Sequence, residues 1–361
     1  MLVRLGVLGC GGIARAAHLP TLARTAGAQV IAIADTDPEN LARAQALAPA
    51  ARAVRDVAAM IEMPDVDAVI VALPPALHAD AAIASLGAGK HVYIEKPLAT
   101  TLSDARRVYA AWEGSGLTAM MGFNYRFNPI IDRARTRLAA GAIGLPIAIR
   151  TVFSTSRREI PDWKAQRASG GGALLDLAVH HIDLVRFLFG TEITGVSAEI
   201  RSTTSDDDTT FLQLRLTNGA TAQTMCSLSA VEEDRIEIYG TTGRLTVDRY
   251  RSLRLDQTPA ATDGALGNAA RRLIRELSAA PYALEKRRAP MHDPSFPIAM
   301  NAFVRAVEHR AVATPTLGDG LRAIAVIEAA EQSSFIATTA WMTAAMLTTG
   351  GCRNTRTRSP R

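Results

Sequence analysis

A short glycine-rich turn near the N-terminus places the strongest constraint on how this chain can fold. The segment Gly9-Cys10-Gly11-Gly12-Ile13-Ala14 follows the apolar run Val3–Leu8 and precedes a helix-like pattern. In such a turn, Gly9 permits the sharp strand-to-helix reversal, Gly11 leaves room for a pyrophosphate, and Ala14 lets the helix pack closely on the strand. Unpaired N–H groups at the helix start then attract the phosphates. The turn predicts a dinucleotide site formed by Gly9, Gly11, Gly12, Ile13 and Ala14.

An acidic residue at the end of the next apolar run bears on the choice of cofactor. Asp35 follows the run Val30–Ala34, where a carboxylate can accept hydrogen bonds from ribose hydroxyls. The same carboxylate would repel the 2′-phosphate of NADP, and the residues after it are Thr36 and Asp37 rather than an arginine. We therefore expect NAD as the cofactor in preference to NADP.

The first third of the chain alternates apolar runs with helix-like segments. The strands expected there are Val3–Leu8, Val30–Ala34, Ala68–Leu73, His91–Ile94 and Thr118–Met121. The run that starts at Val66 is almost entirely apolar, which is typical of a strand covered on both faces. Repeated strand–helix units predict an α/β fold, a doubly wound parallel (Rossmann) sheet over residues 1–122, with ligands at the carboxyl ends of its strands.

After Gly122 the pattern becomes that of an α+β domain, which we assign to residues 123–349. Its mostly antiparallel sheet is expected from the strands Ile147–Ser154, Val196–Arg201, Phe211–Thr217, Ala220–Ser227, Arg235–Tyr239 and Arg244–Asp248. The dipeptide Asn218-Gly219 predicts a hairpin turn. Helices expected on one face of this sheet include Gly172–Phe189, Phe296–Glu308 and Gly320–Thr339, and another is expected over Pro129–Ala140. Residues 257–295 have no clear period, and residues 350–361 are expected to form a disordered basic tail.

Composition argues against several kinds of partner. The net charge is +5, but four arginines lie in the last nine residues with no acid beside them, so the body of the chain has no basic stripe and no nucleic acid partner is expected. The three cysteines lack a metal-binding spacing, which favours free thiols in a reducing compartment and hence a cytoplasmic location. The apolar stretch Phe335–Thr349 is too short to cross a bilayer, so no membrane partner is expected.

A lysine is expected in the same crevice as the glycine turn. Glu95-Lys96-Pro97 ends the run His91–Ile94, and the carboxyl ends of parallel strands share one edge of a sheet. Lys96 should therefore project to where the nicotinamide would lie, with Glu95, Pro74 and His78 also at the cofactor. The alternative is a surface lysine beside a turn proline, but its place relative to the glycine turn favours the functional interpretation.

An aspartate and a histidine are expected on one face of the helix that opens with Gly170-Gly171-Gly172. Asp176 and His180 are four residues apart, and Asp183 lies three residues further along the same stripe. A carboxylate beside an imidazole can hold its tautomer and raise its basicity, as a general base requires. The same residues could instead form salt bridges or bind a metal, but no ligand from a third segment is evident, so we expect no metal.

Three further residues are candidates for binding the substrate. Asn124 and Arg126 follow the junction between the two domains, and Trp163 could form a platform for a sugar ring, although tryptophan is usually a core residue. His181 points about 100° away from His180 and is expected either to have a packing role or to support a residue of the site.

In this order the motifs resemble those of the Gfo/Idh/MocA oxidoreductase family. The resemblance runs through the glycine turn, Asp35, Glu95-Lys96-Pro97, the segment Gly122–Phe127, and Gly171-Gly172 through Asp176 and His180. Ala178 stands where that helix commonly has a glycine. The family implies a Rossmann domain followed by an open-faced, mostly antiparallel sheet that often forms an oligomer interface, so a homo-oligomer (dimer or tetramer) is expected.

The resemblance also implies an activity and roles for three residues. Lys96, Asp176 and His180 resemble the catalytic set of the inositol dehydrogenases, in which His180 would take the hydroxyl proton, Asp176 would orient His180, and Lys96 would polarise the hydroxyl. The implied function is an NAD(P)-dependent oxidoreductase that transfers a hydride between nicotinamide and a carbinol carbon of a sugar, inositol or related polyol. Two alternatives stay open: an NAD-dependent glycosidase that oxidises, eliminates and re-reduces, and a catalytically silent cofactor-binding sensor.

Overall fold

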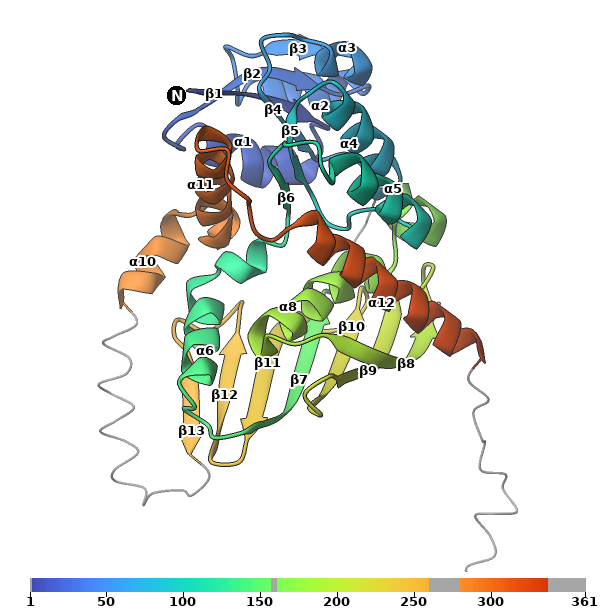
Figure 1. Ribbon diagram of the computed structural model, residues 1–361, viewed down its shortest axis with the longest axis vertical. Coiled ribbons are helices and arrows are strands. Elements are labelled where there is room, and N and C mark those ends of the chain that lie inside the picture. The colour runs from blue at the N-terminus through green and yellow to red at the C-terminus, as the bar shows by residue number, and fades with distance from the viewer. Residues whose placement is uncertain (1, 157–160, 260–279, 337–361) are drawn as a thin grey trace, which may run out of the picture.

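Two β-sheets organise the chain in the computed structural model, which describes residues 2–156, 161–259 and 280–336 (Figure 1). The first sheet has six strands, all parallel, in the order β3-β2-β1-β4-β5-β6. Its strands are β1 (Val3–Leu8), β2 (Ala28–Ala34), β3 (Arg52–Val54), β4 (Ala68–Val71), β5 (His91–Ile94) and β6 (Ala119–Met121). The second sheet has seven strands in the order β13-β12-β11-β7-β10-β9-β8.

Helices cover both faces of the first sheet, which confirms the predicted doubly wound parallel architecture. They are α1 (Leu19–Leu22), α2 (Pro38–Gln45), α3 (Val57–Ile61), α4 (His78–Gly87) and α5 (Leu102–Trp112). Every residue of β4 is buried, because its apolar side chains have covering elements on both faces. The edge strand β3 is a short element that the hydrophobic pattern did not predict.

The glycine turn has the conformation that its sequence requires. Gly9 has φ +89°, and a Cβ atom there would lie 2.5 Å from the carbonyl oxygen of Ala72, so only glycine allows β1 and β4 to lie so close at this end. The helix that follows starts with a wide π-helical turn, η1 (Ala14–His18), before α1. The N–H groups at its start thus point toward the carboxyl edge of the sheet.

The second sheet is antiparallel except for the pairing of β7 with β10, as the sequence predicted in outline. Its strands are β7 (Pro146–Ser154), β8 (Ile193–Arg201), β9 (Thr209–Leu216), β10 (Thr221–Ser227), β11 (Glu233–Gly240), β12 (Gly243–Asp248) and β13 (Asp256–Pro259). The predicted hairpin joins β9 to β10, with Gly219 at φ +84°. Buried and exposed residues alternate along β9, as expected for a sheet with only one covered face.

Three helices cover one face of this sheet (Figure 1). They are α6 (Pro129–Ala139), α8 (Val179–Phe189) and α12 (Leu317–Ile336). On the opposite face, the large apolar side chain of Phe211 is 41% exposed in this single chain.

One helix expected on the second sheet packs elsewhere. The predicted helix Phe296–Glu308 is α11 (Ser295–Glu308), and it lies against β1 and α1 of the first sheet. Its apolar face, which includes Met300, Phe303 and Val304, joins the same core cluster as β1. The ring of Phe303 meets that of Tyr93 edge-on, with centroids 5.7 Å apart. The chain therefore returns to the first sheet after completing the second.

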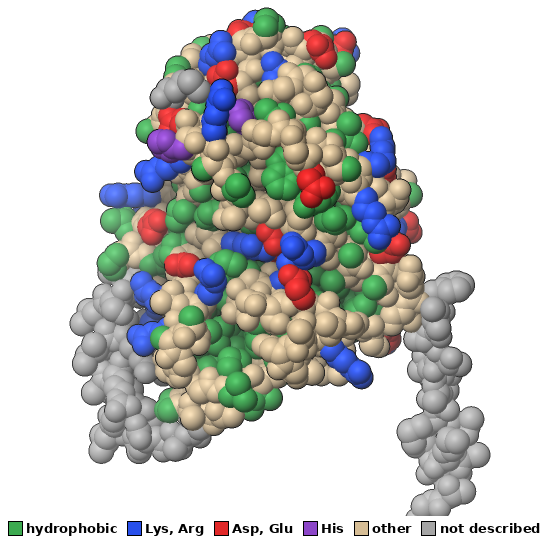
Figure 2. Space-filling model, viewed as in Figure 1, with side chains coloured by type: hydrophobic (Ala, Val, Ile, Leu, Met, Phe, Trp, Pro, Cys, Tyr) green, Lys and Arg blue, Asp and Glu red, His purple; other side chains and the backbone are tan. Residues whose placement is uncertain are grey.

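The remaining segments are short or lie outside the described residues. The region without a clear period, 257–295, includes the end of β13, α10 (Ala280–Arg288) and the turn η6 (Pro290–His292), while 260–279 is not described. The tail 350–361 and the end of the predicted last helix also lie outside the described residues. Within the described ranges, no helix has both the length and the apolar character needed to cross a membrane. On the face seen in Figure 2, basic and acidic side chains are interspersed.

Candidate active site

Lys96 and Asp176, eighty residues apart in sequence, meet at the carboxyl edge of the first sheet. Lys96 follows β5, and Asp176 lies in a π-helical turn, η5 (Leu174–Ala178), that precedes α8. The Lys96 ammonium donates to Asp176 twice, at 2.7 Å to its carboxylate Oδ1 and at 2.7 Å to its backbone carbonyl. The structure thus brings together two residues of the set that the resemblance implies.

A second lysine, which the sequence analysis missed, binds the other oxygen of the same carboxylate. Lys164 lies in α7 (Asp162–Ala165), and its ammonium donates to Oδ2 of Asp176 at 2.9 Å. Burial alone would raise the pKa of Asp176, but the two ammonium groups outweigh it and hold that pKa well below its usual range. Asp176 is therefore a carboxylate at any pH at which the protein would work.

The three consecutive glycines explain how Lys164 comes so close to Asp176. A Cβ atom on Gly171 would lie 2.2 Å from the carbonyl oxygen of Lys164, and one on Gly170 would lie 2.4 Å from the Cβ of Pro75. The segment around α7 and the loop after β4 thus both press directly on the start of this helix. In the sequence the glycine run indicates only a helix start, and nothing in its spacing identifies Lys164.

His180 lies beside this cluster of Lys96, Asp176 and Lys164. In the described part of the chain His180 and Asp176 form no hydrogen bond, and each carboxylate oxygen accepts from a lysine. A direct role of Asp176 in orienting His180 therefore stays a prediction. It assumes an α-helical spacing, whereas Asp176 lies in a wider π-helical turn, where residues four apart are no longer on one line.

A ring stack fixes His180. Its imidazole lies flat on the ring of Tyr125, with centroids 4.2 Å apart and planes inclined by 12°. Its Nδ1 is buried and has no hydrogen-bond partner within the described ranges. Burial, then the nearby charges of Lys96 and Arg249, hold the pKa of His180 below its usual 6.5. The imidazole is thus neutral near pH 7 and able to accept a proton.

A buried ionic cluster contacts the Tyr125 ring of this stack. The Arg249 guanidinium lies 4.0 Å from the centroid of the Tyr125 ring. It donates at 2.7 Å to Asp234 and at 2.7 Å to Asp293. Asp234 also contacts His181, whose Nε2 lies 3.2 Å from Oδ1. His181 is fully buried, in agreement with its expected packing role.

The glycine turn and Asp35, at the carboxyl edge of the first sheet, fit a dinucleotide. Cβ atoms built on Gly11 and Gly12 would meet nothing within 4 Å, so the backbone there is open to approach. Asp35 accepts from the N–H groups of Cys10 at 2.7 Å and Asp37 at 2.9 Å, one on each oxygen. A carboxylate has about four acceptor sites, so each oxygen keeps capacity for a ribose hydroxyl. Ile13 and Ala14 occupy the start of the helix, as predicted.

The other predicted cofactor residues lie in the segments after β4 and β5, next to Lys96. His78 lies between two backbone segments, with Nδ1 2.7 Å from the Pro97 carbonyl and Nε2 2.8 Å from the Leu73 carbonyl. It thereby ties the loop that contains Pro74 to the Glu95-Lys96-Pro97 segment. Glu95 is buried and contacts Nε2 of His18 at 2.8 Å.

The predicted substrate residues divide into two groups. Trp163 is partly exposed and lies next to Lys164, whose ammonium is 5.4 Å from the ring centroid. Asn124 is buried and donates to the Ser295 hydroxyl at 2.8 Å. Arg126 forms a paired ionic contact with Asp183, with its Nε 2.8 Å from Oδ2. Asn124 and Arg126 are thus occupied by protein partners, whereas Trp163 is available.

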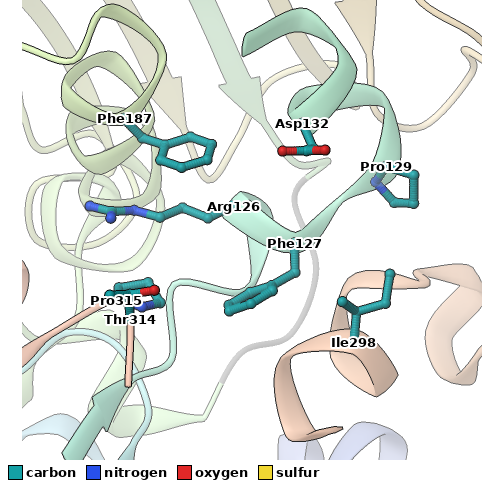
Figure 3. A pocket seen from close by; sticks show the side chains of 8 residues that line it. All are labelled: Arg126, Phe127, Pro129, Asp132, Phe187, Ile298, Thr314 and Pro315. Atoms are coloured by element: carbon teal, nitrogen blue, oxygen red, sulfur yellow. The ribbon is translucent and has the colours of Figure 1, made fainter. Parts of the chain in front are cut away.

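Arg126 also lines a pocket of about 430 Å³ at the junction of the two sheets. Figure 3 shows its side chain extending past the ring of Phe187, whose centroid lies 5.1 Å from the guanidinium carbon. The other residues around this pocket are Phe127, Pro129, Asp132, Ile298, Thr314 and Pro315. Neither Lys96 nor His180 is among the described residues that line it.

The metal alternative gains no support from the described residues. Asp183, the third candidate ligand, is paired with Arg126. No group of three or more His, Cys, Asp or Glu side chains is arranged to hold a metal ion within the described ranges.

Comparison with known proteins matches both sheets to one family. Residues 3–123 match the oxidoreductase family with an NAD-binding Rossmann fold, and residues 131–246 match the GFO/IDH/MocA C-terminal domain. The myo-inositol 2-dehydrogenase of Thermotoga maritima is 31% identical over 258 residues, which cover 69% of this chain and 76% of that protein.

Two solved structures extend the comparison. A levoglucosan dehydrogenase in complex with NADH and levoglucosan is 25% identical, with a TM-score of 0.78 and coverage of 92% of this chain and 97% of that chain. A 3-ketoreductase from Actinomadura kijaniata in complex with NADP and TDP-benzene is 26% identical, with a TM-score of 0.75 and coverage of 92% and 98%.

Proposed function

Because the chain belongs to the GFO/IDH/MocA oxidoreductase family, we propose that it is an NAD-dependent dehydrogenase or reductase of a sugar, inositol or related polyol. The observation that carries this proposal is the meeting of Lys96, Asp176 and His180 at the carboxyl edge of the sheet that also bears the glycine turn. Relatives named for myo-inositol and for levoglucosan support a cyclic polyol or sugar as the substrate class.

In this proposal the residues of the first sheet hold the cofactor. Gly9, Gly11, Gly12, Ile13 and Ala14 would receive the pyrophosphate at the helix start, and Asp35 the ribose hydroxyls. The walls around the nicotinamide would be formed by Pro74, His78, Glu95 and Lys96. Bound NAD supplies the acceptor, or NADH the donor, of the hydride.

The side chains at the reacting hydroxyl have separate roles. His180 would take the hydroxyl proton at Nε2, because its Nδ1 is sealed from solvent. Lys96 has three N–H donors, two of which are bound to Asp176, so the third would donate to the substrate oxygen as negative charge develops there. Trp163 would form one wall for the ring. Asn124 and Arg126 would act by holding the domain junction in place.

The preference for NAD rests on the charge of Asp35, and it can be tested by removing that charge. Arg15 binds Asn40 at 2.9 Å and Arg55 reaches the Thr36 carbonyl at 3.4 Å, so two arginines flank the region of Asp35. In Asp35→Ser, the carboxylate that would repel the 2′-phosphate is removed, so the attraction of these arginines would be opposed less. We expect the ratio of kcat/KM for NADP to that for NAD to rise by roughly tenfold or more. An unchanged ratio would contradict the assignment.

Further features of the proposal concern the whole molecule. We propose that residues 1–122 form the cofactor domain and residues 123–349 the substrate domain, with α11 returning to the first. The face of the second sheet that no helix covers, with Phe211 exposed, supports a homo-oligomer, either a dimer or a tetramer. The unpaired, buried thiols of Cys10 and Cys226 support a cytoplasmic location.

The test of the proposed function is the near-ultraviolet absorbance of reduced nicotinamide. Purified protein would be mixed with NAD or NADP and a panel of inositols, aldoses and sugar acids. We expect absorbance to rise with one substrate class and with NAD. Cleavage of an aryl glycoside without net NADH would favour the glycosidase instead. Tight cofactor binding without turnover of any panel member or glycoside would favour the sensor.

A further inference from the structure

Lys164 has contacts that a solvent-facing lysine would not have. Its side chain is 27% exposed, and its ammonium binds the one oxygen of Asp176 that Lys96 leaves free. Its backbone carbonyl accepts from the N–H of Gly172 at 3.3 Å, so the helix start fixes its main chain as well. Asp176 is thus held from two sides by two lysines that come from different domains.

We propose that Lys164 is a positioning residue for the reaction: by fixing the Asp176 carboxylate, it sets the direction in which Lys96 donates and the negative charge that His180 experiences. This inference rests on the proposed function of Lys96 and His180. The direction in which Lys96 donates depends on how its three N–H groups are used. With two N–H groups of Lys96 committed to Asp176, the orientation of Asp176 determines where the third N–H points.

The electrostatic environment of His180 is set by the charged groups around it. Lys96 and Arg249 are the cationic groups that act on it, Asp176 is the anionic one, and His181 is its titratable neighbour. Lys164 acts on His180 through Asp176, because it neutralises part of that carboxylate's charge. Without Lys164, Asp176 would attract a proton to His180 more strongly.

The test compares Lys164→Gln with Lys164→Arg in the full chain. The glutamine is of similar length but uncharged, whereas the arginine restores the charge next to Asp176. Arg52→Gln is a matched control, because it removes one positive charge from an exposed pair with Asp65. The histidine titration is followed by NMR, with the His180 signal identified by its loss in His180→Gln. This readout does not require turnover.

We expect the His180 pKa to rise by about half a pH unit in Lys164→Gln. It should stay at the wild-type value in Lys164→Arg and Arg52→Gln. If His180 titrates in Lys164→Gln as in the wild type, the inference is wrong, whatever the activity of the protein.

Kinetics separate this inference from the proposed function. On the substrate found with the panel, we expect kcat of Lys164→Gln to fall roughly tenfold, the scale of one lost charge-assisted hydrogen bond, and the acid limb of kcat/KM to move to higher pH. Lys164→Arg should recover most of the rate. A loss of rate that is equal at every pH would indicate a merely structural role. Absence of wild-type turnover would contradict the proposed function, while the NMR titration would still decide the role of Lys164.

Discussion

Two ionic clusters lie near His180, and they differ in how much of their side chains is exposed to solvent. The first consists of Lys96, Asp176 and Lys164, whose side chains are 16%, 14% and 27% exposed. The second consists of His181, Asp234, Arg249 and Asp293, in which Asp234 and His181 are fully buried. Each cluster holds a carboxylate between two basic side chains.

The difference shows how neighbouring residues of α8 can have separate roles, His180 in the proposed reaction and His181 in packing. In the first cluster Lys96, which is partly exposed, has a third N–H donor beyond its two bonds to Asp176, and the proposed role at the substrate requires such a donor. In the second, both oxygens of Asp234 are bound by buried partners, and the Arg249 guanidinium lies against Tyr125. The first cluster is therefore suited to chemistry and the second to holding the ring stack, although His180 and His181 are adjacent in sequence.

The largest expected difference between the two clusters is in how much each contributes to the free energy of unfolding. In Asp234→Asn, the charge of Arg249 would lose one of its two buried carboxylate partners, and breaking such a pair costs about 3–5 kcal/mol. We expect this loss in the free energy of unfolding, measured by urea denaturation. Asp176→Asn is the counterpart in the accessible cluster, and we expect a smaller loss of stability and a larger loss of turnover. Equal losses of stability in both variants would contradict the assignment of a mainly structural role to the second cluster only.

The adjacent histidines give the next largest contrast. His180→Ala should reduce kcat by roughly a hundredfold or more, the scale of a general base. His181→Asn should lower the free energy of unfolding by about 1–3 kcal/mol, because Asp234 loses a buried partner, while the folded enzyme keeps its turnover within a few-fold. Steady-state kinetics and denaturation of both variants provide the check. A His180→Ala variant with near-wild-type kcat would remove the role we assign to it.

A smaller effect concerns pH. His180 must be neutral to accept a proton, and its pKa is held below 6.5 by burial and by Lys96 and Arg249. Oxidation should therefore retain its rate as the pH falls through 6.5 and decline only at lower pH, where the imidazole becomes protonated. The pH profile of kcat/KM for oxidation tests this expectation. An acid limb centred above 6.5 would show that the charges around His180 have been misjudged.

The parts of this arrangement that depend on local sequence could be predicted. The glycine turn, the buried strands and the Asn218-Gly219 hairpin each follow from short patterns with one physical cause. The order of strands then places Lys96 at the carboxyl edge of the sheet, near the turn. These features identify the fold, whereas the resemblance to the family rests on Glu95-Lys96-Pro97 together with Asp176 and His180.

The contacts that depend on tertiary packing could not be predicted. Lys164 reaches Asp176 only because a loop presses on Gly171, and Arg249 reaches Tyr125 from a different strand end. A spacing of four residues also did not predict the π-helical turn at Asp176, which changes which side chains share a face with His180. Likewise, the apolar stripe of α11 indicated a helix but not which of the two sheets it would cover.

The most direct test of the central claim is to follow a deuterium label through one turnover. The polyol identified with the panel would be prepared with deuterium on the carbon that bears the reacting hydroxyl, and mixed with NAD and enzyme. Direct hydride transfer predicts that the label appears on the reduced nicotinamide, with a primary isotope effect, and that Lys96→Met and His180→Ala both slow its appearance. Deuterium released to water instead, or label transfer at the wild-type rate in both variants, would contradict the account.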